Sequence, residues 1–357
     1  MSRDLLLAIL DLARWAPSGD NTQPWRFEIV APDRIAIHGF DTRTHVIYDF
    51  DGHASQMAHG ALLETLRIAA STHALEASWS LRPGTPDSAP IYDVLLRAAP
   101  GLTPDPLAAV IRQRVVQRRP MRTTPLTAAQ RRSLADAPGP GFTVQLFEST
   151  PQRLQVARLL WQNAGLRLTC PEAYPVHRDI IEWNARFSKD RIPDQAVGVD
   201  PMTAKLMHWV MQSWERVDFF NRYLLGTVAP RIQLDFLPAL ACAAHLLMRP
   251  GQALASPADY VRAGIALQRV WLTAATNGLY LQPEMTPVIF RWYVQAGRPI
   301  SALPAINRGA RSLAARFDAL AGAEADAPFA FFCRVGNSSE PAARSIRKEV
   351  GELLIGS

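Results

Sequence analysis

Apolar residues recur at helical spacing along much of this chain. In residues 4–16 the apolar positions Leu6, Ile9, Leu10 and Ala13 would share one helical face, and Pro17 would end the helix. Residues 54–72, 127–136 and 150–168 show comparable patterns. A serine, a proline and an acidic residue open the stretch at 256–259, which is typical of a helix start, and that helix is predicted to reach about residue 277.

Shorter apolar stretches between these helices predict strands. Residues 27–30 and 34–37 flank a turn at 31–33, and residues 77–81 and 92–97 flank a loop rich in proline. Residues 142–147, 238–247 and 330–335 are further strand candidates. The arginine-rich residues 105–119 are expected to be helical, and residues 344–354 to form a short helix at the end.

The order of these elements predicts an α+β fold with mainly antiparallel sheets flanked by helices, rather than alternating βαβ units. The two halves, 1–104 and 105–357, look architecturally alike but share no obvious sequence repeat. The chain has no Gly-x-Gly-x-x-Gly and no P-loop motif, which argues against a Rossmann or Walker nucleotide site.

Composition narrows the functional classes. The 357 residues are 48% hydrophobic and 20% charged, which is typical of a globular protein, and the net charge is +6. Without zinc-finger spacing or an RNA-binding aromatic signature, we expect no nucleic-acid partner. Three widely spaced cysteines, Cys170, Cys242 and Cys333, indicate reduced core residues.

Two further absences are expected from the sequence. The longest apolar run near the start, residues 5–10, is too short for a membrane span, so a cytoplasmic protein without membrane association is predicted. The spacing of His53 and His59 does not suit a metal site on one helical face, and no metal is expected.

The stretch RWAPSGDNTQPWRFEI, residues 14–29, is the most distinctive in the chain. Ordinary turns use serine, glycine, aspartate and asparagine freely, but have less use for Gln-Pro-Trp. So many hydrogen-bonding side chains in one loop suggest that it holds a flat molecule with polar edges. The alternative is an ordinary turn between a helix and a strand. Trp25 is expected to pack in the core beside the loop.

This stretch resembles the flavin-binding loop of the nitroreductase family, whose usual form is ARxAPSxxNxQPW. The family's arginine motif is similar to RVVQRRPM in the second half, with Arg114 and Arg118 at matching positions and Val116 in place of the usual serine. AATNGLYLQPE at 274–284 resembles the family's segment beside the flavin ring, and FCRVGN followed by ARSIRKEV resembles its last strand and phosphate-binding segment.

The resemblance also implies an overall organisation. In the family, one subunit supplies the loop and the other the arginines; here they stand in the two halves of one chain. The chain therefore looks like a tandem nitroreductase, a fused pseudo-dimer that would be monomeric and would keep one flavin site. RDIIEWNARFSKDRIPDQAVG at 178–198 is similar to the tandem type, which implies a lid over the flavin within 171–235.

The resemblance implies FMN as cofactor, and three groups of residues for it. Arginine binds phosphate in a bidentate manner, so the phosphate candidates are Arg114, Arg344 and Arg347. Arg118 would lie at the ring edge that gains negative charge on reduction. The loop candidates are Pro17, Ser18, Asn21 and Gln23, and the candidates beside the ring are Leu281, Gln282 and Pro283. The alternatives are a solvated arginine face and a plain helix end.

No side chain is expected to be catalytic, because the flavin carries the hydride. We expect an FMN-dependent oxidoreductase that reduces a small-molecule acceptor, with NAD(P)H as a possible co-substrate. Glu284 follows the ring-side residues and is either a bonding partner there or a surface carboxylate. Two other functions stay open: a flavin-storage protein, and a tailoring oxidase acting on a peptide or metabolite.

Overall fold

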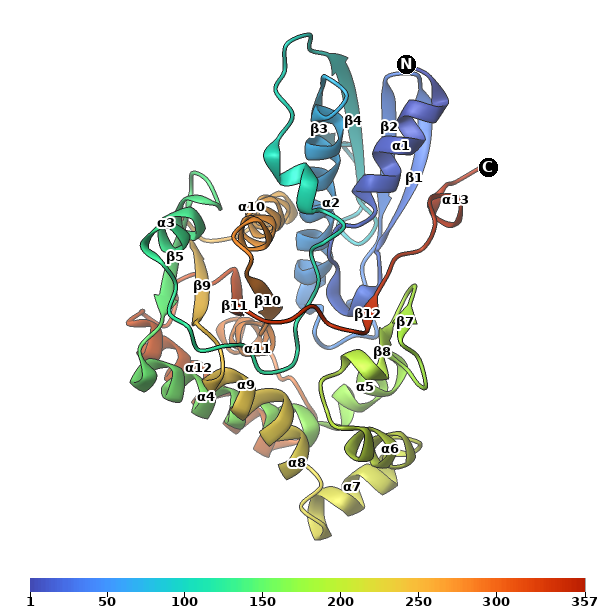
Figure 1. Ribbon diagram of the computed structural model, residues 1–357. Helices are drawn as coiled ribbons and strands as arrows, with labels where there is room; N and C mark the ends of the chain where they lie inside the picture. Colours follow the sequence, from blue (N-terminus) through green and yellow to red (C-terminus); the bar gives the residue numbers. More distant parts are fainter. Residues whose placement is uncertain (357) are drawn as a thin grey trace.

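Two four-stranded sheets form the framework of the protein, whose computed structural model describes residues 1–356 (Figure 1). The strands of the first sheet lie in the order β1 (Trp25–Ala31), β2 (Arg34–Gly39), β4 (Ile91–Ala98), β3 (Leu75–Leu81). Those of the second lie in the order β5 (Phe142–Phe147), β9 (Ala244–Pro250), β11 (Phe331–Gly336), β10 (Tyr280–Pro283). All neighbouring pairs in both sheets are antiparallel, so the predicted α+β fold is confirmed.

The two sheets share one topology. Along the chain, each consists of two strands, then a long helix, then two more strands, and in each sheet the fourth strand lies between the second and the third. The long helices are α2 (His53–Ser71) and α10 (Pro257–Thr276), and a shorter helix precedes each sheet, α1 (Arg3–Ala13) and α3 (Ala128–Asp136).

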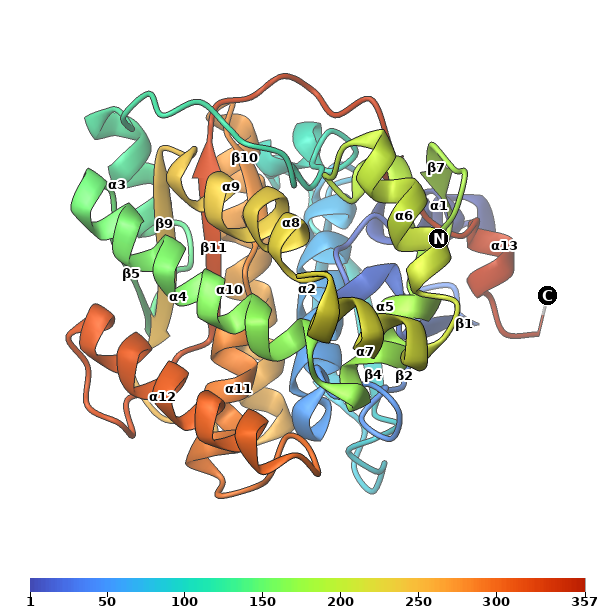
Figure 2. The same ribbon diagram turned by 90° about the horizontal axis from the view of Figure 1, so that it is seen from below.

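Helices α2 and α10 pack against each other between the two sheets (Figures 1 and 2). Their contact is closest at two glycines. A Cβ on Gly60 would lie 1.9 Å from the carbonyl oxygen of Val261, and a Cβ on Gly264 would lie 1.9 Å from that of Met57. The contact is reciprocal, because in each case the carbonyl belongs to the residue three positions before the partner glycine. Glycine is required here for close backbone approach.

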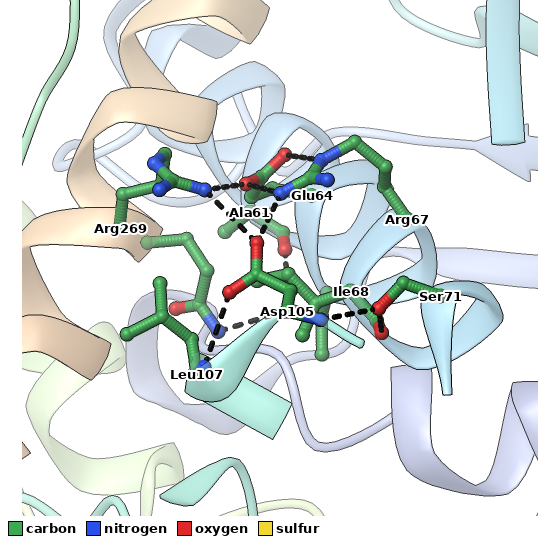
Figure 3. A network of polar contacts seen from close by, with 10 residues as sticks. Ala61, Glu64, Arg67, Ile68, Ser71, Asp105, Leu107 and Arg269 are labelled. Atoms are coloured by element: carbon green, nitrogen blue, oxygen red, sulfur yellow. Dashed lines mark hydrogen bonds and ion pairs between the residues drawn. The ribbon is translucent and has the colours of Figure 1, made fainter. Parts of the chain in front are cut away.

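An ion-pair network joins this helix pair to the segment that follows the first sheet (Figure 3). The carboxylate of Glu64 on α2 accepts hydrogen bonds from Arg67 and from Arg269 of α10, both at 2.8 Å. Arg67 also donates to Asp105 at 2.7 Å. Burial would raise the pKa of Asp105, but hydrogen bonds from Arg67 and from a backbone amide hold it below its ordinary value. The network fixes the start of the arginine-rich segment.

Three helices, α4 (Thr150–Leu168), α11 (Thr286–Gln295) and α12 (Pro304–Ala321), accompany the second sheet, and α4 lies beside α12 (Figure 2). A long segment, residues 171–236, lies between α4 and β9. Its helices are α5 (Tyr174–Asp179), α6 (Pro201–Val210), α7 (Trp214–Tyr223), α8 (Val228–Pro230) and a π-helix at Arg231–Phe236. Its short strands are β6 (Ile181–Glu182), β7 (Phe187–Ser188) and β8 (Ile192–Pro193), and α9 (Leu237–Leu240) follows it.

After β11 the chain crosses back to the first sheet (Figure 1). In this C-terminal arm, residues 337–356, β12 (Arg344–Ser345) pairs in parallel with β7, and α13 (Val350–Leu353) follows. Leu354 forms a bridge with Phe27 of β1. The guanidinium of Arg14 donates to the carbonyl of Lys348 at 2.8 Å and pairs with Glu349.

Three predictions of local structure are wrong over most of their length. Residues 105–119 form only a 3-10 turn at Pro106–Val110, after which the chain is extended because Val116 bridges to Leu281. Residues 344–354 are helical only in α13, since the amide of Ile346 donates to Ser188 of β7. The strand predicted at 238–247 begins only at Ala244, because the residues before it continue the helix from the π-helix.

The remaining predicted helices and strands are present with bounds that differ by a few residues. The three cysteines are free and buried, and Trp25 is fully buried, as expected. None of the helices described in residues 1–356 is both long enough and apolar enough to cross a membrane.

Candidate functional site

The loop after α1 adopts a conformation that non-glycine residues rarely take. Asp20, Asn21 and Gln23 all have positive φ values, 50°, 63° and 49°. Aspartate and asparagine tolerate this region, but glutamine does so only at an energetic cost. Surrounding contacts therefore have to hold the loop in place.

Those contacts come from the C-terminal arm and from the segment before β8. The Gln23 amide nitrogen donates to the carbonyl of Lys189 at 2.8 Å, and its oxygen accepts from the backbone amide of Lys348 at 2.9 Å. Asn21 donates to the carbonyl of Ile346 at 3.1 Å. The Ser18 hydroxyl accepts from the backbone amide of Gln23 at 2.9 Å. Gln23 thus fixes the shape of the loop.

The arginine segment lies against the edge strand β10. The backbone amide of Gln117 donates to the carbonyl of Leu281 at 3.2 Å, and Arg334 of β11 donates to the carbonyl of Arg118 at 2.7 Å. Because residues alternate in direction along an extended chain, Arg114, Val116 and Arg118 lie on one side of it. That side faces the loop after α1.

A small cavity of about 70 Å³ lies where the loop, the arginine segment and the C-terminal arm meet. Seven of the predicted site residues line it: Pro17, Ser18, Asn21, Arg114, Arg118, Arg344 and Arg347. None of these four arginines forms an ion pair with a carboxylate among residues 1–356. Three of them hydrogen-bond to backbone carbonyls instead: Arg114 to Trp15 at 2.7 Å, Arg344 to Arg114 at 3.2 Å, and Arg347 to Ala16 at 3.1 Å.

The electrostatics of this cavity favour an anion. Burial, together with the neighbouring Arg347 and Arg344, lowers the pKa of Arg114 well below its ordinary value. Burial and the same kind of repulsion lower the pKa of Arg347 to about 9. The Nε atom of Arg114 is buried without a hydrogen-bond partner in the described residues. Buried, clustered cations that form no ion pair are costly unless an anion joins them.

A much larger cavity of about 620 Å³ adjoins the small one. Pro17, Ser18, Asp20, Val116 and Arg118 line both, so the two spaces meet at these residues. Burial lowers the pKa of Arg118 to about 10, against the attraction of Asp20. A cavity of this size is typical of a small-molecule site.

Of the residues predicted to lie beside the ring, two line the large cavity and one does not. Gln282 and Pro283 of β10 line the large cavity, and the buried carboxamide oxygen of Gln282 has no hydrogen-bond partner within residues 1–356. The side chain of Leu281 is fully buried and lines neither cavity. Leu281 contributes its backbone carbonyl, which accepts the hydrogen bond from the backbone amide of Gln117. Gln23 lines neither cavity as well.

A buried charged triad forms part of the wall. Glu284 accepts from Arg334 at 3.0 Å and pairs with the Nδ1 atom of His245 at 2.8 Å. Burial would lower the pKa of His245, but the charge of Glu284 and the neighbouring Cys242 thiol raise it to about 10. Burial would raise the pKa of Glu284, but His245 and Arg334 hold it below its ordinary value. With His245 protonated and Glu284 ionised beside the cationic Arg334, the triad carries one net positive charge.

Sequence reasoning considered Glu284 but missed the rest of this triad. The available signal was weak: His245 and Arg334 lie among apolar residues in the strands AHLLMRP and FFCRVG. It also missed the polar group around Arg167 of α4. There Arg167 pairs with Asp235 at 3.2 Å, and the hydroxyl of Tyr48 lies 2.8 Å from the Nε2 atom of His177. All four side chains line the large cavity.

No group of three or more potential metal ligands gathers in the described part of the chain. What the site offers is a cationic recess for an anion, next to a large cavity with a mixed polar and apolar lining.

Comparisons with known proteins give distant similarities. No protein-family model matches the chain. A curated Mycobacterium tuberculosis protein described as uncharacterized is 26% identical over 286 residues, which is 76% of this chain. The chain spans about 37% of that relative's length.

Solved structures with a similar arrangement include the FMN-dependent nitroreductase NfnB from Mycobacterium smegmatis in complex with NADPH. It is 14% identical, with 70% of this chain and 98% of that chain covered and a TM-score of 0.39. A nitroreductase with bound FMN from Desulfitobacterium hafniense is 12% identical, with 68% and 95% covered and a TM-score of 0.35.

Proposed function

We propose that this protein is an FMN-dependent oxidoreductase of the nitroreductase type. The observation that carries the proposal is the cationic recess: four arginines from two distant segments converge on Ser18 without a carboxylate partner in residues 1–356. The loop at 17–25 is the same stretch whose sequence resembles the family's flavin-binding loop.

The residues of both cavities suit FMN. Arg114, Arg344, Arg347 and the Ser18 hydroxyl would hold the phosphate in the small cavity, because guanidinium groups bind phosphate through charge-assisted hydrogen bonds. The large cavity would take the ring, with Arg118 at the junction of the two spaces. When bound, FMN supplies hydride transfer through its N5 atom.

The protein's own residues would orient and tune this chemistry. Gln282 and Pro283 present one wall of the cavity, and the orphaned carboxamide oxygen of Gln282 is free to accept a hydrogen bond. Arg118 and the His245–Glu284–Arg334 triad make that side of the cavity positive, which favours negative charge on a bound ring. NAD(P)H is our proposed reductant and a small molecule the acceptor.

We further propose that the chain is a fused pseudo-dimer with a single flavin site. Two features support this: the identical strand order of the two sheets and the reciprocal glycine contact of α2 with α10. The loop after α3 that corresponds to residues 17–25 is APGPG at 137–141, and it has no hydrogen-bonding side chains. The second half therefore lacks a loop that could hold a second flavin.

The test is the spectrum of the purified protein, with the released cofactor identified by mass. We expect a yellow protein that releases FMN and is rapidly bleached by NADPH under anaerobic conditions. A yellow protein that is bleached by dithionite but not by NADPH would support a flavin-storage function in place of the reductase function. A colourless protein that ignores added FMN would overturn the proposal.

A further inference from the structure

Helix α6 directs its apolar stripe into the large cavity rather than into a packed core. Leu206, Met207 and Val210 of α6 and Met211, which caps its C-terminal end, all line the cavity. Such a stripe normally packs on a core. Here no residue of α6 is buried, because part of the surface that the stripe faces is open cavity.

Helix α7 continues this apolar wall. Trp214, Val217 and Phe220 line the cavity, whereas Phe219, next to Phe220, lies outside it and is 52% exposed. Together the inner faces of α6 and α7 form what we call the apolar chamber. Apolar side chains that face a void lack dispersion contacts on that side, and an apolar occupant would restore them.

The chamber has one polar end, on α4. Asn163 and Arg167 lie one turn apart and both line the cavity. Asn163 is 1% exposed, and its carboxamide oxygen has no hydrogen-bond partner in residues 1–356. A buried amide without a partner is costly, so its presence at this position indicates a ligand group that bonds to it.

The charges at this end are largely balanced. Arg167 already pairs with Asp235, and burial keeps the pKa of His177 down at about 3, so His177 is neutral. Asp20 also lines the cavity, and burial raises its pKa against the attraction of Arg118 and Arg167. The charges of Arg167 and Asp235 already balance each other, so this pair offers no counter-charge to a charged ligand. A neutral hydrogen-bonding group therefore suits this end best.

The chamber walls are adaptable. Few polar contacts connect α6 and α7 to the rest of the protein. The Tyr174 hydroxyl donates to the carbonyl of Met211 at 2.8 Å, and Asn221 donates to that of Leu168 at 2.9 Å. The Gln233 amide bonds to Thr203 of α6 and to the preceding Asp200. Met207 and Met211 are unbranched side chains that adjust to different shapes. The wall can therefore accept bulky molecules of more than one shape.

We propose that the apolar chamber binds a bulky, mainly apolar molecule whose single neutral polar group hydrogen-bonds to Asn163. Such a molecule is the substrate class of the site, an assignment that rests on the proposed flavin function. The binding itself depends only on the chamber.

The test is calorimetric titration of the purified protein with 4-alkylphenols from 4-methylphenol to 4-heptylphenol. These are neutral probes with one hydroxyl and a variable apolar tail. We expect affinity to rise by about fourfold for each added methylene group, as expected for burial in an apolar space. Affinity that does not change with tail length, or absence of binding, would overturn the proposal.

Two pairs of comparisons locate the binding. Val217→Asp places a carboxylate inside the chamber and Phe219→Asp places one on the outer face of the same helix; we expect only the first to reduce affinity for 4-heptylphenol, by tenfold or more. The wild type should bind 4-heptylphenol about tenfold more tightly than its methyl ether, and Asn163→Leu should remove that preference. Equal effects of both aspartates, or an unchanged preference, would contradict the proposal.

Flavin content, read from the visible absorbance, separates this inference from the proposed function. A colourless protein whose affinity still depends on tail length would support binding in the chamber and contradict the proposed flavin function. A yellow protein whose affinity does not depend on tail length would contradict binding in the chamber and leave the proposed flavin function intact. Thermal melts of each variant check that a loss of affinity does not reflect unfolding.

Discussion

At the scale of residues, the site is defined by charges that lack ordinary partners. Arg114, Arg344 and Arg347 repel one another in a buried recess and bond only to backbone carbonyls. The triad in the wall is the opposite case, since Glu284 forms ion pairs with both His245 and Arg334. The recess is therefore prepared for an added anion, whereas the triad is complete.

The triad makes stability depend on pH. Because the folded pKa of His245, about 10, lies above its ordinary value of 6.5, its stabilising effect is complete below pH 6.5 and is lost as pH rises toward 10. We expect the free energy of unfolding in urea to fall over this range. His245→Gln should lose about 3 kcal/mol at neutral pH and lack this part of the slope.

The exposed His73 provides the control, because His73→Gln should keep the pH dependence of the wild type. If His245→Gln kept the wild-type slope, the proposed charge state of the triad would be wrong.

At the scale of elements, local pattern predicted most helices and strands, and failed where distant segments decide the structure. The capped helix α10 and the hairpin of β1 and β2 follow from spacing and turn residues that lie within the element. The arginine segment is extended because it pairs with Leu281, more than 160 residues away in the sequence. Nothing local distinguishes it from a helix.

The same contrast applies to the site. The loop at 17–25 stood out in the sequence because Gln-Pro-Trp is unusual in an ordinary turn, and the arginines were found through their resemblance to the nitroreductase arginine motif. His245 and Arg334 did not stand out, since each lies among apolar residues of a strand that looks like core, and Asn163 is one of many polar residues of α4. Their roles depend on the partners that the fold brings to them, or on the lack of a partner.

The contact between α2 and α10 gives a direct test at this scale. We expect Gly60→Ala and Gly264→Ala each to lower the free energy of unfolding by about 2–3 kcal/mol or more, because the added methyl meets a backbone carbonyl that cannot move away. Gly351→Ala in α13 is the control; nothing lies within 4 Å of its added Cβ, so stability should change little. Equal effects at all three positions would argue against the close packing.

At the scale of the whole molecule, the candidate site combines residues from both halves of the chain and from the C-terminal arm. The first half supplies the loop, the second half supplies Arg114, Arg118 and β10, and the C-terminal arm returns to add Arg344 and Arg347. Both halves of the proposed pseudo-dimer thus lie in one chain, and a second copy is not required to complete the site.

This organisation predicts the mass of the working unit. Light scattering combined with size-exclusion chromatography should give a particle of one chain, 39.5 kDa, carrying one FMN. An obligate dimer that loses its flavin on dissociation would show instead that the site lies between chains.

The central claim is that the arginine recess binds the phosphate of FMN, and comparing FMN with riboflavin measures this directly, because the two differ only in that phosphate. We expect apoprotein to bind FMN about 100-fold more tightly than riboflavin, since several charge-assisted hydrogen bonds are gained. Arg114→Gln should reduce that ratio at least tenfold, while Arg119→Gln, an exposed arginine in the same segment, should leave it unchanged. Equal affinity of the wild type for the two flavins would contradict the account.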